Sequence, residues 1–93
     1  PKPGEGPSRE KRENGNYDVL FCADVDNKVI KASVAGDMDP GYGSTSKMIT
    51  ESAVCLLKEA DDLPGGIYTP ASSLGKRLIK RLQDNAGLTF KVE

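Results

Sequence analysis

Apolar and polar residues alternate over two neighbouring stretches in the first half of the chain. Every second residue from Tyr17 to Val25 is apolar, and a similar alternation runs from Lys28 to Ala35. A period of two is typical of β-strands with two unlike faces. Asp26-Asn27 lies between the stretches, and both residues tolerate the left-handed backbone of a tight turn. The pattern predicts an antiparallel hairpin.

The period becomes helical after residues 36–43, which contain three glycines and a proline and predict an irregular turn. Apolar and small residues recur at helical spacing from Met48 to Ala60, and we expect Ser44 or Thr45 to cap this helix. A second helix is predicted after Thr69 as its cap and Pro70 in its first turn.

The second predicted helix closes near Asn85, with Gly87 as a left-handed C-terminal cap. Its inward residues are predicted to be Leu74, Leu78, Ile79 and Leu82. Its outward residues are predicted to be Lys76, Arg77, Lys80 and Arg81.

A final alternation from Leu88 to Val92 predicts a third strand. The order is β-β-α-α-β, which predicts an α+β fold with a small antiparallel sheet and two helices packed on one face. Residues 1–16 have no apolar anchor, so they are expected to be a flexible linker or arm before a small domain at residues 17–93.

The first predicted strand carries apolar residues on both faces. Tyr17, Val19 and Phe21 point to the side opposite Leu20 and Cys22. A free-standing domain would leave one of these faces uncovered, whereas a fragment of a larger sheet would have a neighbour there. A homodimer through the sheet edge or the apolar face is the other arrangement that would cover it.

Composition mainly excludes functions. The net charge of −1 gives no reason to expect nucleic acid as a partner, and no apolar run approaches the roughly 20 residues that span a membrane. The chain has no His, so the familiar Ser-His hydrolase arrangements are excluded. Cys22 and Cys55 are expected to be small buried residues rather than a disulfide, and no metal site is expected.

The turn GDMDPGYG at residues 36–43 has two interpretations. Its backbone N–H groups could hold an anionic group at the start of the helix. Alternatively it is a tight strand-to-helix turn, with Asp39 or Ser44 capping the helix and Tyr42 packed on the core, and this interpretation is favoured. The spacing does not match a dinucleotide-binding or P-loop motif. For the four cations of the second helix, a solvated face is favoured over a phosphate contact.

Two ordered stretches resemble a known family. They are DPGYGSTSKMITESAVCL at residues 39–56 and LPGGIYTPASSLGKRLIKRL at residues 63–82, preceded by GEGPSREKREN at residues 4–14. All three resemble the C-terminal end of saccharopine dehydrogenase-like oxidoreductases, including those called trans-acting enoyl reductases. The resemblance covers nearly the whole chain in the right order.

The resemblance implies a parent protein with an N-terminal Rossmann domain that binds NAD(P), and this chain would be a part of its second domain. No cofactor is expected in the fragment, and no catalytic residue is assigned to it. The residues expected to line a substrate cleft are Asp39, Gly41, Tyr42, Gly43 and Thr69. The partner is the Rossmann domain, and the expected localisation is cytoplasmic. The alternative function is a free-standing interaction module without catalysis.

Overall fold

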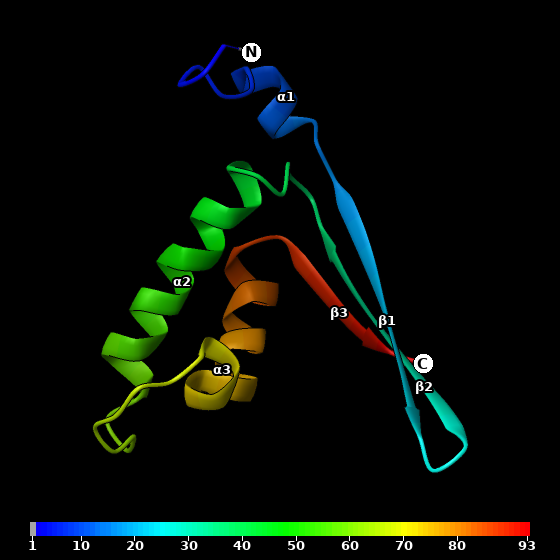
Figure 1. Cartoon of the computed structure of the whole chain (residues 1–93). Helices are drawn as coiled ribbons and strands as arrows, with labels where there is room; N and C mark the ends of the chain where they lie inside the picture. Colours follow the sequence, from blue (N-terminus) through cyan, green and yellow to red (C-terminus); the bar gives the residue numbers. More distant parts are fainter. Residues whose placement is uncertain (1) are drawn as a thin grey trace.

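The computed structural model describes residues 2–93 and has the predicted order of elements, preceded by one short helix (Figure 1). The α+β class and the β-β-α-α-β order are confirmed. The elements are α1 (Arg9–Glu13), β1 (Tyr17–Val25), β2 (Lys28–Gly36), α2 (Gly43–Glu59), α3 (Pro70–Asn85) and β3 (Leu88–Val92).

The three strands form one antiparallel sheet in the order β1-β2-β3. Asp26 and Asn27 form the predicted two-residue turn and have φ values of 50° and 60°, as a type I′ hairpin requires. The third strand pairs only with the half of β2 from Ala32 to Gly36. The rest of the hairpin, residues 21–31, is called the distal hairpin below, and beyond the Phe21–Ala32 pair it is two-stranded.

The register gives the sheet two unlike faces, because residues directly opposite each other share a face. The inner face, which holds the residues that pack on the core, consists of Tyr17, Val19, Phe21, Ala23, Val25, Lys28, Ile30, Ala32, Val34, Gly36, Leu88, Phe90 and Val92. The outer face carries Asp18, Asp24, Lys31, Ser33, Thr89 and Lys91 together with Leu20, Cys22, Val29 and Ala35.

The core lies at one end of this inner face. α3 packs against β3 and α2 packs against α3, whereas the distal hairpin extends away from both helices (Figure 1). The buried core residues are Cys55, Ala60, Leu74, Leu78, Leu82, Ala86 and Leu88, with Val34, Met48, Leu63 and Phe90 packed against them. Ile79 was expected in this core, but it is exposed.

Helix α3 is interrupted at Gly75, which has φ 51° and ψ −129°. Only glycine adopts this region readily, because a Cβ would be strained there. The helical spacing of Leu74, Leu78 and Leu82 continues across the break, so the hydrophobic pattern gave no sign of it.

The predicted arm contains regular structure. Ser8 caps α1 by accepting a hydrogen bond from the Lys11 backbone, and Arg9 forms an ion pair with Glu13 at 2.7 Å. The Asp39 backbone N–H donates to the Arg12 carbonyl at 3.0 Å, which ties the arm to the turn before α2. Residue 1 lies outside the described residues, and the division into an arm and a domain stays a prediction.

Candidate functional site

The turn before α2 is organised around the carboxylate of Asp39. It accepts hydrogen bonds from the backbone N–H groups of Gly41 at 2.9 Å, Tyr42 at 3.2 Å and Gly43 at 2.6 Å. The Ser44 N–H donates to the Asp39 carbonyl at 2.8 Å. Together these bonds satisfy the first backbone donors of α2, which would otherwise lack partners.

This geometry decides between the two interpretations of the turn. The donors that could have held an anion are already bonded to a carboxylate of the same turn, so the tight-turn interpretation fits the structure. Asp39 satisfies these amides from the turn, whereas the N-cap position itself is Tyr42, whose side chain makes no capping bond. The pKa of the Asp39 carboxyl lies below its ordinary value, chiefly because of the hydrogen bond from Gly43. Two details were wrong: Ser44 and Thr45 both lie inside α2 rather than capping it, and Tyr42 is 60% exposed rather than packed on the core.

Ser44 instead joins the helix to the sheet. Its fully buried hydroxyl lies 2.8 Å from the hydroxyl of Tyr17 on β1. Tyr17 lies opposite Gly36 on β2, where any Cβ would collide with the tyrosine ring. A glycine at position 36 therefore allows Tyr17 to reach α2.

A surface hollow of about 470 Å³ lies between the arm and the turn, and its lining includes Gly6, Arg12, Tyr42 and Ser46. Arg12 donates to the Pro7 carbonyl at 2.7 Å, and the Ser46 hydroxyl donates to the Gly43 carbonyl at 2.9 Å. These polar groups hold the local backbone. Glu5 also lines the hollow, but its carboxylate accepts from the Lys2 backbone N–H at 2.9 Å, whereas the Ser46 hydroxyl donates to Gly43. Within residues 2–93 the hollow therefore does not show a nucleophile hydrogen-bonded to a base, and its geometry can shape a contact.

Thr69 does not join the other predicted site residues. It caps α3 in a reciprocal arrangement in which the Thr69 N–H donates to the Ser72 hydroxyl at 3.1 Å. The Asp39–Gly43 turn lies before the start of α2, whereas Thr69 follows its other end (Figure 1). The 17 residues of α2 span about 25 Å, so one small ligand would not contact both groups.

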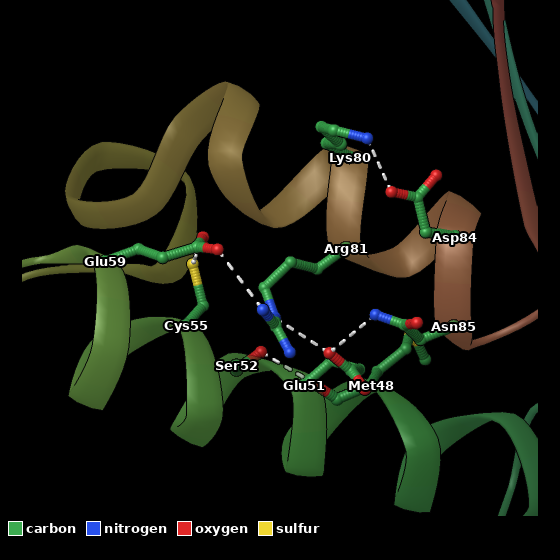
Figure 2. Close-up of polar contacts among 9 residues, drawn as sticks. All are labelled: Met48, Glu51, Ser52, Cys55, Glu59, Lys80, Arg81, Asp84 and Asn85. Carbon is green, nitrogen blue, oxygen red and sulfur yellow. Dashed lines mark hydrogen bonds and ion pairs between the residues drawn. The ribbon is translucent and has the colours of Figure 1, made fainter.

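A polar cluster between α2 and α3 was not predicted from the sequence (Figure 2). Arg81 on α3 forms ion pairs with Glu51 at 2.8 Å and Glu59 at 3.2 Å, both on α2. The prediction that Arg77 and Arg81 point outward was wrong, because Arg77 also reaches α2 and donates to the Glu59 carbonyl. Their spacing of four residues was visible in the sequence, but the side of α3 that α2 covers was not.

Cys55 is buried beside this cluster, and its thiol lies 3.4 Å from Glu59 (Figure 2). Burial, and then the nearby Glu59, raises the pKa of the Cys55 thiol. A raised pKa disfavours the thiolate, which is the nucleophilic form. Cys55 is therefore a core residue as expected, and both cysteines are free, although Cys22 is exposed rather than buried.

Within residues 2–93, acidic and cysteine side chains do not form a group of three or more that could hold a metal ion. The helices of this same range are too short or too polar to cross a membrane. Residues 2–93 also do not form a Rossmann-type nucleotide site, because the strands are all antiparallel and the first amide of α2 is taken by Asp39. We therefore assign no step of hydride transfer to this chain.

Most of the chain matches mycobacterial proteins that are named as enzymes. A Mycobacterium tuberculosis protein with the provisional description of a trans-acting enoyl reductase is 38% identical over 85 residues, which cover 88% of this chain and 20% of that protein. The trans-acting enoyl reductases of Mycobacterium bovis and Mycobacterium ulcerans are 34% and 35% identical, with the same shares covered. No family model and no solved structure matches the chain.

The chain thus spans about a fifth of the length of the curated relatives it matches, and the match falls in their C-terminal part. These relatives confirm the part of the predicted resemblance that named trans-acting enoyl reductases. The saccharopine dehydrogenase-like relationship stays a prediction.

Proposed function

We propose that this chain is the C-terminal supporting region of an NAD(P)-dependent oxidoreductase of the trans-acting enoyl reductase type. The remainder of such an enzyme, with a Rossmann domain in the saccharopine dehydrogenase-like arrangement, would bind NAD(P) and carry out the reduction. The identity to the mycobacterial relatives, which extends over most of this chain, supports the assignment.

The observation that carries the supporting role is the surface area of the chain. A compact monomer of 9.9 kDa exposes about 5,200 Å², whereas this chain exposes 7032 Å². Its radius of gyration is 15.7 Å, against about 12 Å for a compact domain of this length. Exposed large apolar side chains include Phe21, Ile30, Ile49, Leu56, Leu57, Ile67 and Val92. Such a surface is typical of a region that other polypeptide covers.

Within that role, the five predicted cleft residues make different contributions. The backbone N–H groups of Gly41 and Gly43 donate hydrogen bonds to the Asp39 carboxylate, so these three residues hold the shape of the turn. Thr69 is occupied with capping α3. Tyr42 has an exposed ring on the wall of the hollow, and we propose that it is the one of the five whose side chain contacts a substrate or the neighbouring domain.

A chimera tests the assignment. The matching C-terminal region of the Mycobacterium bovis trans-acting enoyl reductase is replaced by this chain, and NADPH-dependent reduction of an enoyl thioester is measured. We expect turnover within about tenfold of the parent enzyme, and loss of turnover when the region is deleted. A chimera that melts cooperatively and binds NADPH but does not turn over would contradict the proposal.

The isolated chain supplies a second test. Titration with NADPH, followed by the fluorescence of the nucleotide, is expected to show no saturable binding. Saturable binding by this chain alone would contradict the placement of the cofactor in the remainder of the enzyme.

A free-standing interaction module is the second candidate, and the exposed inner face of the sheet favours it. The chimera distinguishes the two. An interaction module has no reason to restore turnover to an enzyme from which the matching region has been removed.

A further inference from the structure

An apolar wedge opens between α3 and the inner face of the sheet. Its hollow has a volume of about 320 Å³ and is lined by apolar residues, among them Pro70, Ala71, Gly75, Ile79 and Phe90. Helix α3 and the strands diverge along this side of the molecule (Figure 1). The wedge therefore has an aliphatic helix wall and a sheet wall.

The sheet wall continues into the distal hairpin, where it is not covered by either helix. Phe21 is 54% exposed and Ile30 is 47% exposed on the inner face, and Val25 is exposed beyond them. The outer face of the same hairpin carries Asp24 and Lys31 beside Cys22 and Val29. The inner face is thus the more apolar of the two, and its one charged residue is Lys28 at the tip.

We propose that a second copy of this chain provides the cover, with the distal hairpin of each copy lying in the wedge of the other. A protruding apolar strand pair and an apolar hollow are present on the same chain, so a two-fold axis can satisfy both at once. The walls are almost uncharged and the net charge is only −1, so the pairing does not bring strong like charges together.

The area agrees with this arrangement. The chain exposes about 1,800 Å² more than a compact monomer of its mass. Two copies need to bury only about 800 Å² each, less than half of this excess, to form an interface of standard size. The remainder includes Ile49, Leu56 and Ile67, which lie outside the wedge and the hairpin and stay available to the rest of the parent protein. The inference goes beyond the enzymatic assignment and does not depend on it.

Sedimentation equilibrium of the purified chain, from micromolar to sub-millimolar concentration, tests the proposal. We expect a species of twice the 9.9 kDa chain mass. Ile30→Asp is expected to weaken the dimer by about 30-fold or more, since it places a charge in the apolar contact. Ile79→Asp on the helix wall is expected to do the same, and circular dichroism verifies that each variant is folded.

Val29→Asp is the matched control. Val29 is adjacent to Ile30 on the same strand and is 65% exposed, but it lies on the outer face. Its variant is expected to remain dimeric. A monomeric wild-type chain at all concentrations would overturn the proposal and leave the wedge to another polypeptide. Equal weakening by Val29→Asp, or dimers that neither Ile30→Asp nor Ile79→Asp affects, would also overturn it and would indicate a different face or the sheet edge.

The chimera test and the sedimentation test fail independently. A monomeric chain that restores turnover contradicts the dimer and supports the enzymatic role. A dimeric chain that does not restore turnover supports the dimer and contradicts the enzymatic role.

Discussion

The junction of α2, α3 and β3 and the distal hairpin are two regions built from similar aliphatic residues. At the junction, Leu78 and Leu88 are buried, because side chains from two helices and a strand meet there. In the distal hairpin, Phe21 and Ile30 have the same strand-like alternation but remain about half exposed. Alternation therefore specifies which face a residue occupies, and the fold decides whether anything lies opposite that face.

Truncation of one residue from each region should show the largest difference. Leu78→Ala is expected to lower the free energy of unfolding by about 2–5 kcal/mol, because it leaves a cavity in the core. Phe21→Ala is expected to cost less than about 1 kcal/mol, because much of the ring is already in water. Urea unfolding at low protein concentration, where self-association contributes little, measures both. Equal losses would mean that the distal hairpin is packed in the single chain.

The break in α3 lies where the packed region borders the wedge. Gly75→Ala is expected to cost about 1–3 kcal/mol, because φ 51° with ψ −129° is strained for any residue with a Cβ. Gly65→Ala is the matched control, because a Cβ there meets no atom within 4 Å and the backbone is not left-handed. Its effect on unfolding is expected to be within about 0.5 kcal/mol. Similar values for the two variants would contradict the broken helix.

Two ion pairs of α3 allow the same comparison between a largely buried side chain and an exposed one. Arg81→Met is expected to destabilise the chain by about 1–2 kcal/mol, since the Arg81 side chain is 21% exposed and its loss leaves Glu51 without an ion pair, with only the 3.4 Å hydrogen bond from Asn85. Lys80→Met removes an ion pair with Asp84 whose lysine side chain is 78% exposed, and less than about 0.5 kcal/mol is expected. Thermal unfolding of the two variants should separate them, and a larger effect of Lys80→Met would be inconsistent with the cluster.

The smallest expected effect concerns acid. The lowered pKa of Asp39 means that its contribution to stability is present above the ordinary aspartate pKa and is lost as the pH falls through its folded-state value. Asp39→Asn should therefore reduce stability slightly at neutral pH and flatten the acid decline of the urea midpoint. The decline due to Asp62, whose pKa is lowered by Arg77, should remain. Asp24→Asn in the distal hairpin is the control, and an unchanged acid slope in Asp39→Asn would contradict the capping role.

Local rules in the sequence predicted most of the elements. The Asp26-Asn27 turn, the Thr69-Pro70 start of α3 and the glycine at position 87 each depend on the backbone preferences of a few residues. Such preferences do not require a partner elsewhere in the chain, so the strands and helices were predicted with nearly correct bounds.

Tertiary contacts accounted for what was missed. Ser44 is a residue type that often caps helices, but here the Asp39 carboxylate accepts from the first amide of α2. The Ser44 hydroxyl forms a hydrogen bond with Tyr17 instead. Arg81 lies on a charged face of α3 that the helical pattern predicts to be in solvent. It contacts Glu51 because α2 packs over that face, and the sequence pattern does not reveal this packing. The same is true of the candidate site: Asp39 and Thr69 were predicted together, and the length of α2 separates them.

The Asp26-Asn27 turn also has a consequence for the order of folding. It joins strands that are adjacent in the chain, so the hairpin can form in about 1–10 μs without help from distant residues. The third strand follows both helices in the chain and pairs with β2 only after that longer segment is made. The hairpin part of the inner face can thus form before α3 and β3 are made, and during synthesis it is the surface on which a chaperone would be expected to act.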